Sequence, residues 1–462
     1  MAIQSSRIQL LTAHPRRSDG SYVLYWMQQS QRASFNPALE IAIEEANALD
    51  LPVLVCFGLT DGATGYPEAN ARHYAFMLQG LAEVERELAQ RGIAFVIRKG
   101  RPDQVALQLG RDAALIVCDR GYLKPQREWR AALAAATDRL LIQVEGDVVV
   151  PVETASQKHE VAARTLRPKL HRVWDEYLEP ISPRALNRRA DALRIASEID
   201  LSDVTAALQR IAVDTSVPPV KRFTGGTSQA RARLDTYLGR PFASYAKNRS
   251  LPEAGAASHM SPYLHFGHIS PVEIALAVRS AEHGDDEDKS AYLEELIVRR
   301  ELAMNHVFYE RQYDSYEAVP GWARRTLQEH EGDPRPHLYN RDQLERGETH
   351  DRYWNASMKE MRETGYMHNH MRMYWGKKIL EWSPTPDAAF DTTMRINNKF
   401  FLDGRDANSF TNVAWLFGLH DRPWGPRPVF GTVRSMGQAT LKKFDADAYV
   451  RTVDRLAAEE SR

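Results

Sequence analysis

Tryptophans are concentrated in one stretch of this 462-residue chain. Six of the nine lie between residues 322 and 424. Tryptophan is a common core and interface residue, so packing alone accounts for many of them. Trp375 and Trp382, however, are seven residues apart in a stretch, 366–382, that predicts one helix. Two helical turns place both indoles on one face, about 10 Å apart, which suits stepwise electron transfer as well as helix packing.

The same stretch carries an unusual mixture of side chains on a face next to the two tryptophans. This face holds an amide, a guanidinium, a thioether and a glycine, supplied by Asn369, Arg372, Met373 and Gly376. Core faces of helices are normally aliphatic or aromatic, so the mixture is not typical of packing alone. It predicts a wall that faces a planar, partly anionic ligand.

A charged pair lies in a second predicted helix, 291–310. Glu295 and Arg299 are four residues apart, the spacing of an ion pair on one helix face. Such pairs are usually exposed and contribute little to stability. Leu296, Ile297 and Val298 make this stretch apolar nearly all round. Both charges are therefore expected to meet partners in a partly buried site.

Three further segments carry helix-start signals. Ser261-Pro262 places a serine N-cap before a proline, and Ser270 with Glu273 forms a capping-box pattern. The segment 225–228, Gly-Gly-Thr-Ser, is expected to open a helix and to leave its backbone amides accessible. These starts fit a purely structural role, but free N-terminal amides also form phosphate sites.

Short β-rich runs alternate with helical stretches over the first part of the chain. This alternation predicts a Rossmann-like α/β domain, a parallel sheet with helices on both faces. No GxGxxG motif follows the first strand, so the usual dinucleotide fingerprint is missing. The expected strands are 22–27, 53–59, 94–99, 115–119 and 140–144, and the expected helices are 37–48, 71–91 and 102–109.

The pattern changes along the rest of the chain. Prolines, loops and short helical stretches dominate residues 151–224, and helical signals dominate from Ser228 to the end. We therefore expect an α/β domain over residues 20–150, an interdomain linker over 151–224 and an all-helical domain over 225–462.

Composition limits the class of protein. The chain is 43% hydrophobic and 26% charged, as in folded globular proteins. Its longest apolar run, 51–59, is far shorter than the roughly 20 residues that cross a bilayer, and no signal-peptide pattern is present. A cytoplasmic protein is expected. Cys56 and Cys118 lie in apolar runs and are expected to be reduced core thiols, and no metal-site or CxxC spacing occurs.

Charge by itself does not indicate a partner. The formal net charge is −1. Between residues 158 and 249 there are 17 lysines and arginines against 10 acidic residues. This local excess fits phosphate contact and a solvated linker surface equally well.

Several of these segments together resemble the photolyase/cryptochrome family. They are RFTGG (222–226), SHMSPYLHFGHISP (258–271), EELIVRRE (294–301) and TGYMHNHMRM (364–373). More narrowly, the chain resembles the class II cyclobutane pyrimidine dimer photolyases in YWGKK (374–378), LDGRD (402–406) and HDRPW (420–424). The resemblance covers nearly the whole chain, and the motifs occur in the family's order.

The resemblance implies an α/β antenna domain and a helical domain that binds FAD in a U-shaped conformation. The implied contacts to the flavin nucleotide, mostly around its phosphates, are Tyr245, Ser258, Met260, Ser261 and Arg299. The implied neighbours of the ring and ribityl chain are Asn369, Arg372, Asp403 and Asp406. An asparagine near flavin N5 is also implied, for which Asn397 is favoured over Asn408.

The resemblance also implies a lesion pocket and an electron-transfer chain. Glu295 would hydrogen-bond the lesion bases and stabilise the dimer radical anion, and Arg249 would contact a DNA phosphate. Class I members have a tryptophan where this chain has Val298, so another tryptophan is expected to supply that wall. The implied pocket walls are Met373, Trp415 and Trp424. The implied photoreduction chain is Trp375, Trp354 and Trp382, with Trp375 nearest the flavin.

The implied activity is that of a deoxyribodipyrimidine photolyase. Such an enzyme repairs cyclobutane pyrimidine dimers in ultraviolet-damaged DNA by light-driven electron transfer from reduced anionic FAD to a flipped-out lesion. No net redox change occurs, so no nicotinamide or metal is expected. A second, antenna chromophore remains open between a deazaflavin, a folate and an empty site, and a monomer is expected.

Three alternatives share parts of this pattern. A cryptochrome-like photosensor would use the same fold, but the short helical segment 444–460 is not followed by a long tail. A photolyase specific for the (6-4) photoproduct fits the motifs less well than a class II enzyme. An α/β nucleotide-binding metabolic enzyme is the third alternative.

Overall fold

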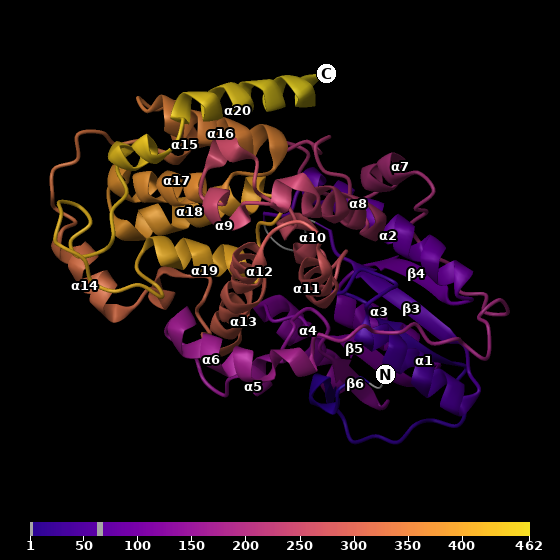
Figure 1. Ribbon diagram of the computed structural model, residues 1–462. Coiled ribbons are helices and arrows are strands. Elements are labelled where there is room, and N and C mark those ends of the chain that lie inside the picture. Colours follow the sequence, from indigo (N-terminus) through magenta and orange to yellow (C-terminus); the bar gives the residue numbers. More distant parts are fainter. Residues whose placement is uncertain (1–2, 62–67) are drawn as a thin grey trace.

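The computed structural model describes residues 3–61 and 68–462, and its first part is built on one six-stranded sheet (Figure 1). The strand order is β1-β6-β5-β2-β3-β4, with β1 antiparallel to β6 and all other pairs parallel. The strands are β1 (Ile8–Leu10), β2 (Tyr22–Trp26), β3 (Val53–Leu59), β4 (Ala94–Lys99), β5 (Ala113–Asp119) and β6 (Leu141–Val144). The five predicted strands are confirmed to within two residues. β1 was not predicted, because three residues without a buried side chain give no apolar pattern.

Helices cover both faces of the sheet, as the alternation predicts. Side chains alternate between the faces along β2, so Val23 and Tyr25 pack in one core while Leu24 and Trp26 pack in the other. The first core includes residues of α1 (Pro37–Leu49) and α2 (Ala71–Gln90), and the second includes α3 (Pro102–Gly110) and α4 (Lys124–Ala136). Cys56 and Cys118 are buried free thiols of the second core.

The connector after β6 consists of short helices and extended segments. Its helices are α5 (Val152–Ala155), α6 (Ala163–Val173) and α7 (Val204–Gln209). Between α6 and α7 the chain runs back along the first part, where the amides of Ala190 and Glu198 donate to carbonyls of residues 92 and 97 at 2.8 Å. The connector is therefore fastened to the α/β part along its length.

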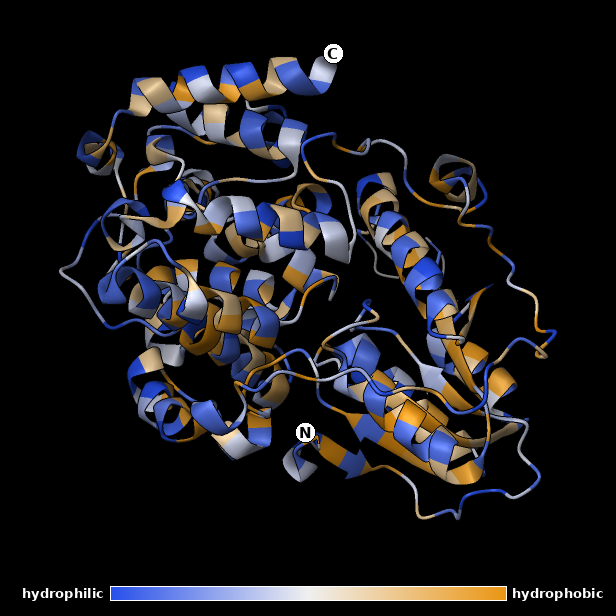
Figure 2. Ribbon diagram, turned by 45° about the vertical axis from the view of Figure 1, so that its right-hand side comes forward, coloured by the Kyte–Doolittle hydropathy of each residue, from blue (hydrophilic) through white to orange (hydrophobic). Residues whose placement is uncertain are grey.

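Beyond residue 226 the described chain consists of helices and the loops that connect them. In Figure 2 these helices carry both polar and apolar residues, whereas the strands of the sheet are mostly hydrophobic. None of the described helices is both long and apolar enough to span a membrane. The helices are α8 (Thr227–Leu238), α9 (Tyr245–Asn248), α10 (Ser261–His265), α11 (Pro271–Ser280), α12 (Asp286–Leu293), a π-helix (Glu294–Arg299), α13 (Arg300–Tyr309), α14 (Gly321–Glu329), α15 (Arg341–Arg346), α16 (Arg352–Thr364), α17 (Asn369–Trp382), α18 (Pro386–Phe400), α19 (Ala407–Leu416) and α20 (Ala446–Ser461).

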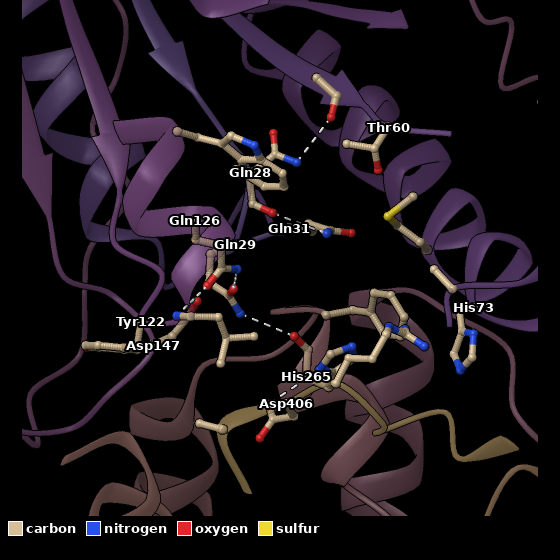
Figure 3. Close-up of a pocket in the computed structure, with 18 of the residues that line it drawn as sticks. Gln28, Gln29, Gln31, Thr60, His73, Tyr122, Gln126, Asp147, His265 and Asp406 are labelled. Carbon is tan, nitrogen blue, oxygen red and sulfur yellow. Dashed lines mark hydrogen bonds and ion pairs between the residues drawn. The ribbon is translucent and has the colours of Figure 1, made fainter. Parts of the chain in front are cut away.

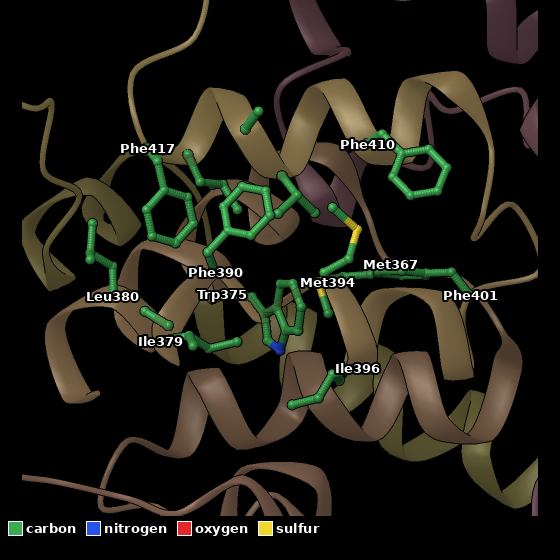
Figure 4. Packing of buried hydrophobic residues seen from close by; sticks show 14 of the residues in the cluster. Met367, Trp375, Ile379, Leu380, Phe390, Met394, Ile396, Phe401, Phe410 and Phe417 are labelled. Atoms are coloured by element: carbon green, nitrogen blue, oxygen red, sulfur yellow. The ribbon is translucent and has the colours of Figure 1, made fainter. Parts of the chain in front are cut away.

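The largest core of the helical part lies between α16, α17, α18 and α19. Trp375 of α17 is 2% exposed and is surrounded by Met367, Phe390, Met394 and Phe401 in Figure 4. The helix that carries it begins at residue 369, three residues later than predicted, because His368 caps it by accepting from the amide of residue 370.

Glycines hold the first helix of this part against α2, which corrects the prediction of accessible amides at 225–228. A side chain at Gly225 would collide with the carbonyl oxygen of Phe76 at 1.9 Å. The amide of Gly225 donates to Gln79, and that of Ser228 donates to Glu83, both at 2.7 Å. The motif therefore joins two helices, and the amides of Gly225, Gly226 and Ser228 already have acceptors.

The other two helix starts differ from each other. Ser270 caps α11 as predicted by accepting from the amide of Val272 at 3.2 Å, while Glu273 pairs with Arg231 at 2.5 Å. The N-cap predicted at Ser261 is wrong, because α10 begins at that residue and has Met260 in the cap position without a side-chain bond.

Buried ionic groups join the α/β part to the helical part. Asp147, just after β6, pairs with Arg32 at 2.7 Å, and its carbonyl accepts from Arg300 of α13 at the same distance. Glu301, next to Arg300, accepts from the amide of Val149 at 2.5 Å. These groups are nearly inaccessible to water, so each depends on its partner, and the contacts of Arg300 and Glu301 cross the junction.

The buried Glu301 predicts a pH-dependent stability. Burial raises its pKa to about 8, although the amides of Val149 and Val150 and the charge of Arg300 oppose this. Between pH 5 and 7 the folded protein keeps a proton that the unfolded chain has lost, so the free energy of unfolding falls by roughly 1 kcal/mol per pH unit from this group. We expect Glu301→Gln to flatten that decline in urea titrations at pH 5, 6 and 7. Equal slopes in both proteins would contradict the prediction.

Candidate functional site

One cavity in the helical part gathers most of the side chains selected from the sequence. Its volume is about 260 Å³. The predicted residues that line it are Tyr245, Ser258, Met260, Ser261, Glu295, Asn369, Arg372, Asp403 and Asp406. They come from several separate stretches of the chain between residues 245 and 406, so only the fold brings them together.

The cavity is completed by Asn408, the less favoured of the two asparagines expected near flavin N5, and by residues to which the sequence gave no role. Asn408 and Asn412 are one helical turn apart on α19, a spacing that could have indicated an amide-lined face. The apolar and aromatic members gave no such signal, because they resemble ordinary core residues. The added lining residues are Leu264, Tyr292, Leu296, Arg300, Tyr366, Met367, Asn408, Ser409 and Asn412.

An ion pair between Arg372 and Asp403 forms one wall of the cavity. Both terminal nitrogens of Arg372 donate to the carboxylate of Asp403 at 3.0 Å, and its Nε donates to the carbonyl of Met367 at 2.9 Å. The guanidinium also lies 3.9 Å from the ring centroid of Phe401. A two-point contact of this kind fixes the plane of the guanidinium, so the wall is rigid.

Asp406 forms a second fixed point of the wall. Its carboxylate caps α19 by accepting from the amide of Asn408 at 2.7 Å, and it lies 3.4 Å from Nδ1 of His265. Burial by itself raises the pKa of Asp406, but the hydrogen bond from His265 and the charges of His265 and Arg300 lower it to about 2. Asp406 is therefore a carboxylate at neutral pH.

A second cavity of about 110 Å³ lies on the other side of His265 and Asp406, between the two parts of the molecule (Figure 3). It opens next to the carboxyl ends of β2, β3 and β5, where parallel sheets commonly bind ligands. Its polar lining is rich in amides: Gln28 donates to the carbonyl of Gly58 at 3.1 Å, and Gln29 donates to that of His265 at 3.2 Å.

The predicted ion pair between Glu295 and Arg299, four residues apart on one helix face, does not form. Residues 294–299 form a π-helix, whose repeat is longer than that of an α-helix, so Arg299 instead pairs with Glu294 at 3.1 Å. Glu295 pairs with Arg249 at 2.9 Å. Arg299 is not among the lining residues of the cavity, and its neighbour Arg300 takes that place.

The three tryptophans predicted to transfer electrons form a buried, contiguous group. Trp375, Trp354 and Trp382 are at most 3% exposed. The indole nitrogen of Trp354 donates to the carbonyl of Trp375 at 2.9 Å, and the rings of Trp354 and Trp382 are 5.5 Å apart between centroids. Trp375 also contacts Phe401, which lies against Arg372, so the group begins next to the cavity wall.

Four other predicted residues lie outside the lining of this cavity. Asn397 is buried and donates to Oδ1 of Asn398 at 3.0 Å. Met373 packs against the core, and Trp415 is half-buried on α19. Trp424 is 40% exposed and is held by a hydrogen bond to Asp421.

Comparison with known proteins decides the family. A sequence profile described as DNA photolyase matches residues 23–186. The deoxyribodipyrimidine photo-lyase of Methanothermobacter thermautotrophicus is 45% identical over 99% of this chain and 100% of its own length. The chain belongs to the photolyase/cryptochrome family. This membership confirms the family resemblance of the sequence motifs.

Solved structures confirm the fold of this photolyase-family chain. The class III photolyase of Agrobacterium tumefaciens superimposes with a TM-score of 0.75 at 21% identity, covering 94% of this chain and 86% of that one. An archaeal photolyase from Sulfolobus tokodaii, described with two FAD molecules, gives 0.70 at 14% identity over 94% and 92% of the two chains. The predicted combination of a parallel-sheet domain and a helical domain is thus confirmed.

Gly376, predicted to face a ligand, instead allows α17 and α19 to pack closely. A side chain at this position would meet Leu416 Cδ1 at 2.1 Å. We expect Gly376→Ala to lower the free energy of unfolding by about 1–3 kcal/mol through overpacking. Chemical denaturation measures this change. An unchanged unfolding midpoint would contradict the prediction, because it would show that α17 and α19 accommodate the added methyl group without loss of stability.

Proposed function

We propose that this protein is a deoxyribodipyrimidine photolyase that repairs cyclobutane pyrimidine dimers in ultraviolet-damaged DNA, driven by light and FAD. The main support is a cavity wall with a fixed Arg372–Asp403 pair, adjoined by a buried tryptophan group. The relative from Methanothermobacter, at 45% identity over its full length, carries the same activity in its name. The motifs YWGKK, LDGRD and HDRPW favour the class II subgroup.

The lining of the cavity fits a flavin adenine dinucleotide. Hydroxyl groups of Tyr245, Ser258 and Ser261 supply donors for a diphosphate. Asp403 and Asp406 supply carboxylate acceptors for ribityl hydroxyls and a ring N–H, and Arg372 supplies a fixed cation that favours a negatively charged ring. The amide of Asn369 adds a neutral donor and acceptor, and Met260 adds an apolar contact.

Two asparagines and one arginine need separate assignment. Asn397 is proposed as the amide near flavin N5, and Asn408, whose Nδ2 donates to Asp406 at 2.8 Å on the cavity wall, is the alternative that the lining favours. Arg299 lies outside the cavity lining and pairs with Glu294 at 3.1 Å, and it is proposed to contact the flavin nucleotide once the cofactor is bound.

The lesion would bind at the mouth of the cavity. Photolyases belong to the enzymes that extrude their target from the duplex, and an extruded dimer needs aromatic walls and polar groups for its base edges. Glu295 lines the cavity and would hydrogen-bond the bases, while Met373, Trp415 and Trp424 would supply the walls. Arg249, paired with Glu295, would exchange that partner for a DNA phosphate.

The chemistry divides between cofactor and protein. A bound reduced flavin supplies one electron on excitation and accepts it back after the cyclobutane bonds break. The protein orients the dimer, excludes water and stabilises the negative charge that develops on the dimer through Glu295. Trp375, Trp354 and Trp382 would carry electrons inward when the cofactor arrives oxidised.

The second cavity is the proposed site of an antenna chromophore. Its amides and aromatic rings suit a neutral, planar heterocycle such as a deazaflavin or a folate ring. The Sulfolobus relative, described with two FAD molecules, supports a second chromophore in this architecture. We further propose residues 20–150 as the antenna domain, 151–224 as linker and 225–462 as the catalytic domain of a cytoplasmic monomer.

Repair should depend on light. Ultraviolet-irradiated oligothymidine incubated with the flavin-loaded protein is expected to regain thymine absorbance under blue or near-ultraviolet light and not in darkness. A cryptochrome-like photosensor would leave the lesions intact in both conditions. Equal rates with and without light would reject the proposed mechanism.

Photoreduction should be separable from repair. We expect Trp375→Phe to stop the photoreduction of oxidised flavin, because it removes the indole next to the cavity wall, yet to retain repair once the flavin is chemically reduced. Trp322→Phe, a tryptophan outside the proposed chain, is the matched control. Absorbance of the oxidised flavin under illumination measures the effect, and normal photoreduction in Trp375→Phe would remove that residue from the chain.

A further inference from the structure

A third cavity, which none of the proposed steps uses, lies behind the Ser258–His259 wall of the flavin cavity. Its volume is about 460 Å³. It is bounded by residues 222–224, by α8 and by the segment 255–259. Ser258 lines both cavities, so the chain segment around this residue separates the third cavity from the flavin cavity. Polar lining is supplied by Arg222, Thr224, Gln229, Arg233, Thr236 and His259.

Two nitrogen donors of these lining residues make no hydrogen bond. Nη1 of Arg222 and Nδ1 of His259 are both buried without a hydrogen-bond partner. Nη2 of Arg222 lies 3.4 Å from Nε2 of His259, and a guanidinium only donates, so Nε2 accepts and the proton of a neutral imidazole is on Nδ1. Buried donors without acceptors are costly, and a bound anion is a common reason for them.

The charge around the cavity is positive. Burial lowers the pKa of His259 well below its usual value, and the charges of Arg222 and Arg233 lower it further, so the imidazole stays neutral. Among the described residues no aspartate or glutamate lines the cavity. Nη1 of Arg222 forms an ion pair with Glu360 at 3.7 Å, which is too long for a hydrogen bond, and burial raises the pKa of Glu360.

The two arginines are held in place by one aromatic ring. Phe223 lies 5.4 Å from the guanidinium carbon of Arg222 and 4.8 Å from that of Arg233. Nη2 of Arg233 also donates to the carbonyl of Arg222 at 2.9 Å. His259 has a φ of 57°, in the left-handed region that few residues other than glycine adopt. The donors are therefore fixed before any ligand arrives.

We propose that this cavity binds a phosphate group through Arg222, Arg233 and the Nδ1–H of His259. Planar guanidinium groups match the oxygens of phosphate, and a neutral imidazole N–H adds a third donor from another direction. The phosphate group can belong to a free anion or to a DNA strand, because both present the same oxygens. The site is separate from the flavin cavity and goes beyond the proposed repair reaction.

Titration of the flavin-loaded protein with inorganic phosphate, followed by calorimetry and by phosphorus NMR, tests this site. Saturable binding of one phosphate is expected. Arg233→Gln should weaken it about tenfold or more, the effect of losing a hydrogen bond to a charged group. Thr236→Glu places a carboxylate on the exposed rim without removing a packed side chain and should weaken binding similarly, while Arg240→Gln, an exposed arginine outside the lining, should not.

The source of the phosphate is distinguished with undamaged oligothymidine. Displacement of bound inorganic phosphate by the oligonucleotide supports strand phosphates as the natural ligand, and its failure supports a free anion. The proposal is overturned if phosphate does not bind, if both cavity variants bind as tightly as the wild type, or if binding occurs only in flavin-free protein. That last outcome would assign the cavity to the flavin's own diphosphate. Repair by chemically reduced Arg233→Gln reports on the repair proposal independently.

Discussion

The wall of the flavin cavity depends on the two-point ion pair between Arg372 and Asp403. Arg372 lies at the start of α17 and Asp403 in the turn after α18, so the pair fixes two helices and the turn that leads to α19. The same guanidinium holds the carbonyl of Met367 and the ring of Phe401. The side chains of Arg372 and Asp403 are mostly buried, so breaking the pair would leave a partly buried charge without a partner.

The turn between α18 and α19, which carries Asp403, also positions other residues of the cavity. Asp406, three residues after Asp403, caps α19 and stays ionised, and its pairing with His265 forms the partition between the flavin cavity and the amide-lined cavity. Trp375 directly precedes Gly376 on α17 and is held inside the core by the close approach of α17 to α19. The cavity wall and the buried tryptophan group next to it are therefore positioned by the same helices.

Polar character differs among the three cavities. The cavity between the two parts of the molecule is rich in amides, and the cavity with the Arg372–Asp403 pair carries both signs of charge. The lining of the cavity behind His259 includes two arginines and, among the described residues, no carboxylate. A cavity whose lining carries an excess of one charge favours ligands of the opposite charge. This contrast is the physical basis for assigning a neutral heterocycle, a flavin dinucleotide and a phosphate group to the three places.

The sequence by itself determined the parallel sheet, the helical second part and most of the flavin cavity's lining. Patterns of apolar residues specify strands and helices locally. The motifs around Ser258, Arg372 and Asp403 contain polar and charged side chains whose chemistry can be recognised without a structure. Tertiary structure alone decided which of these meet. The π-helix turned Arg299 to Glu294, the collision with Phe76 explained Gly225, and Leu416 explained Gly376. The contacts of Gly225 and Gly376 join residues that are distant in the chain, and the pairing of Arg299 depends on a local change of helical repeat. Residue type and spacing do not reveal either effect.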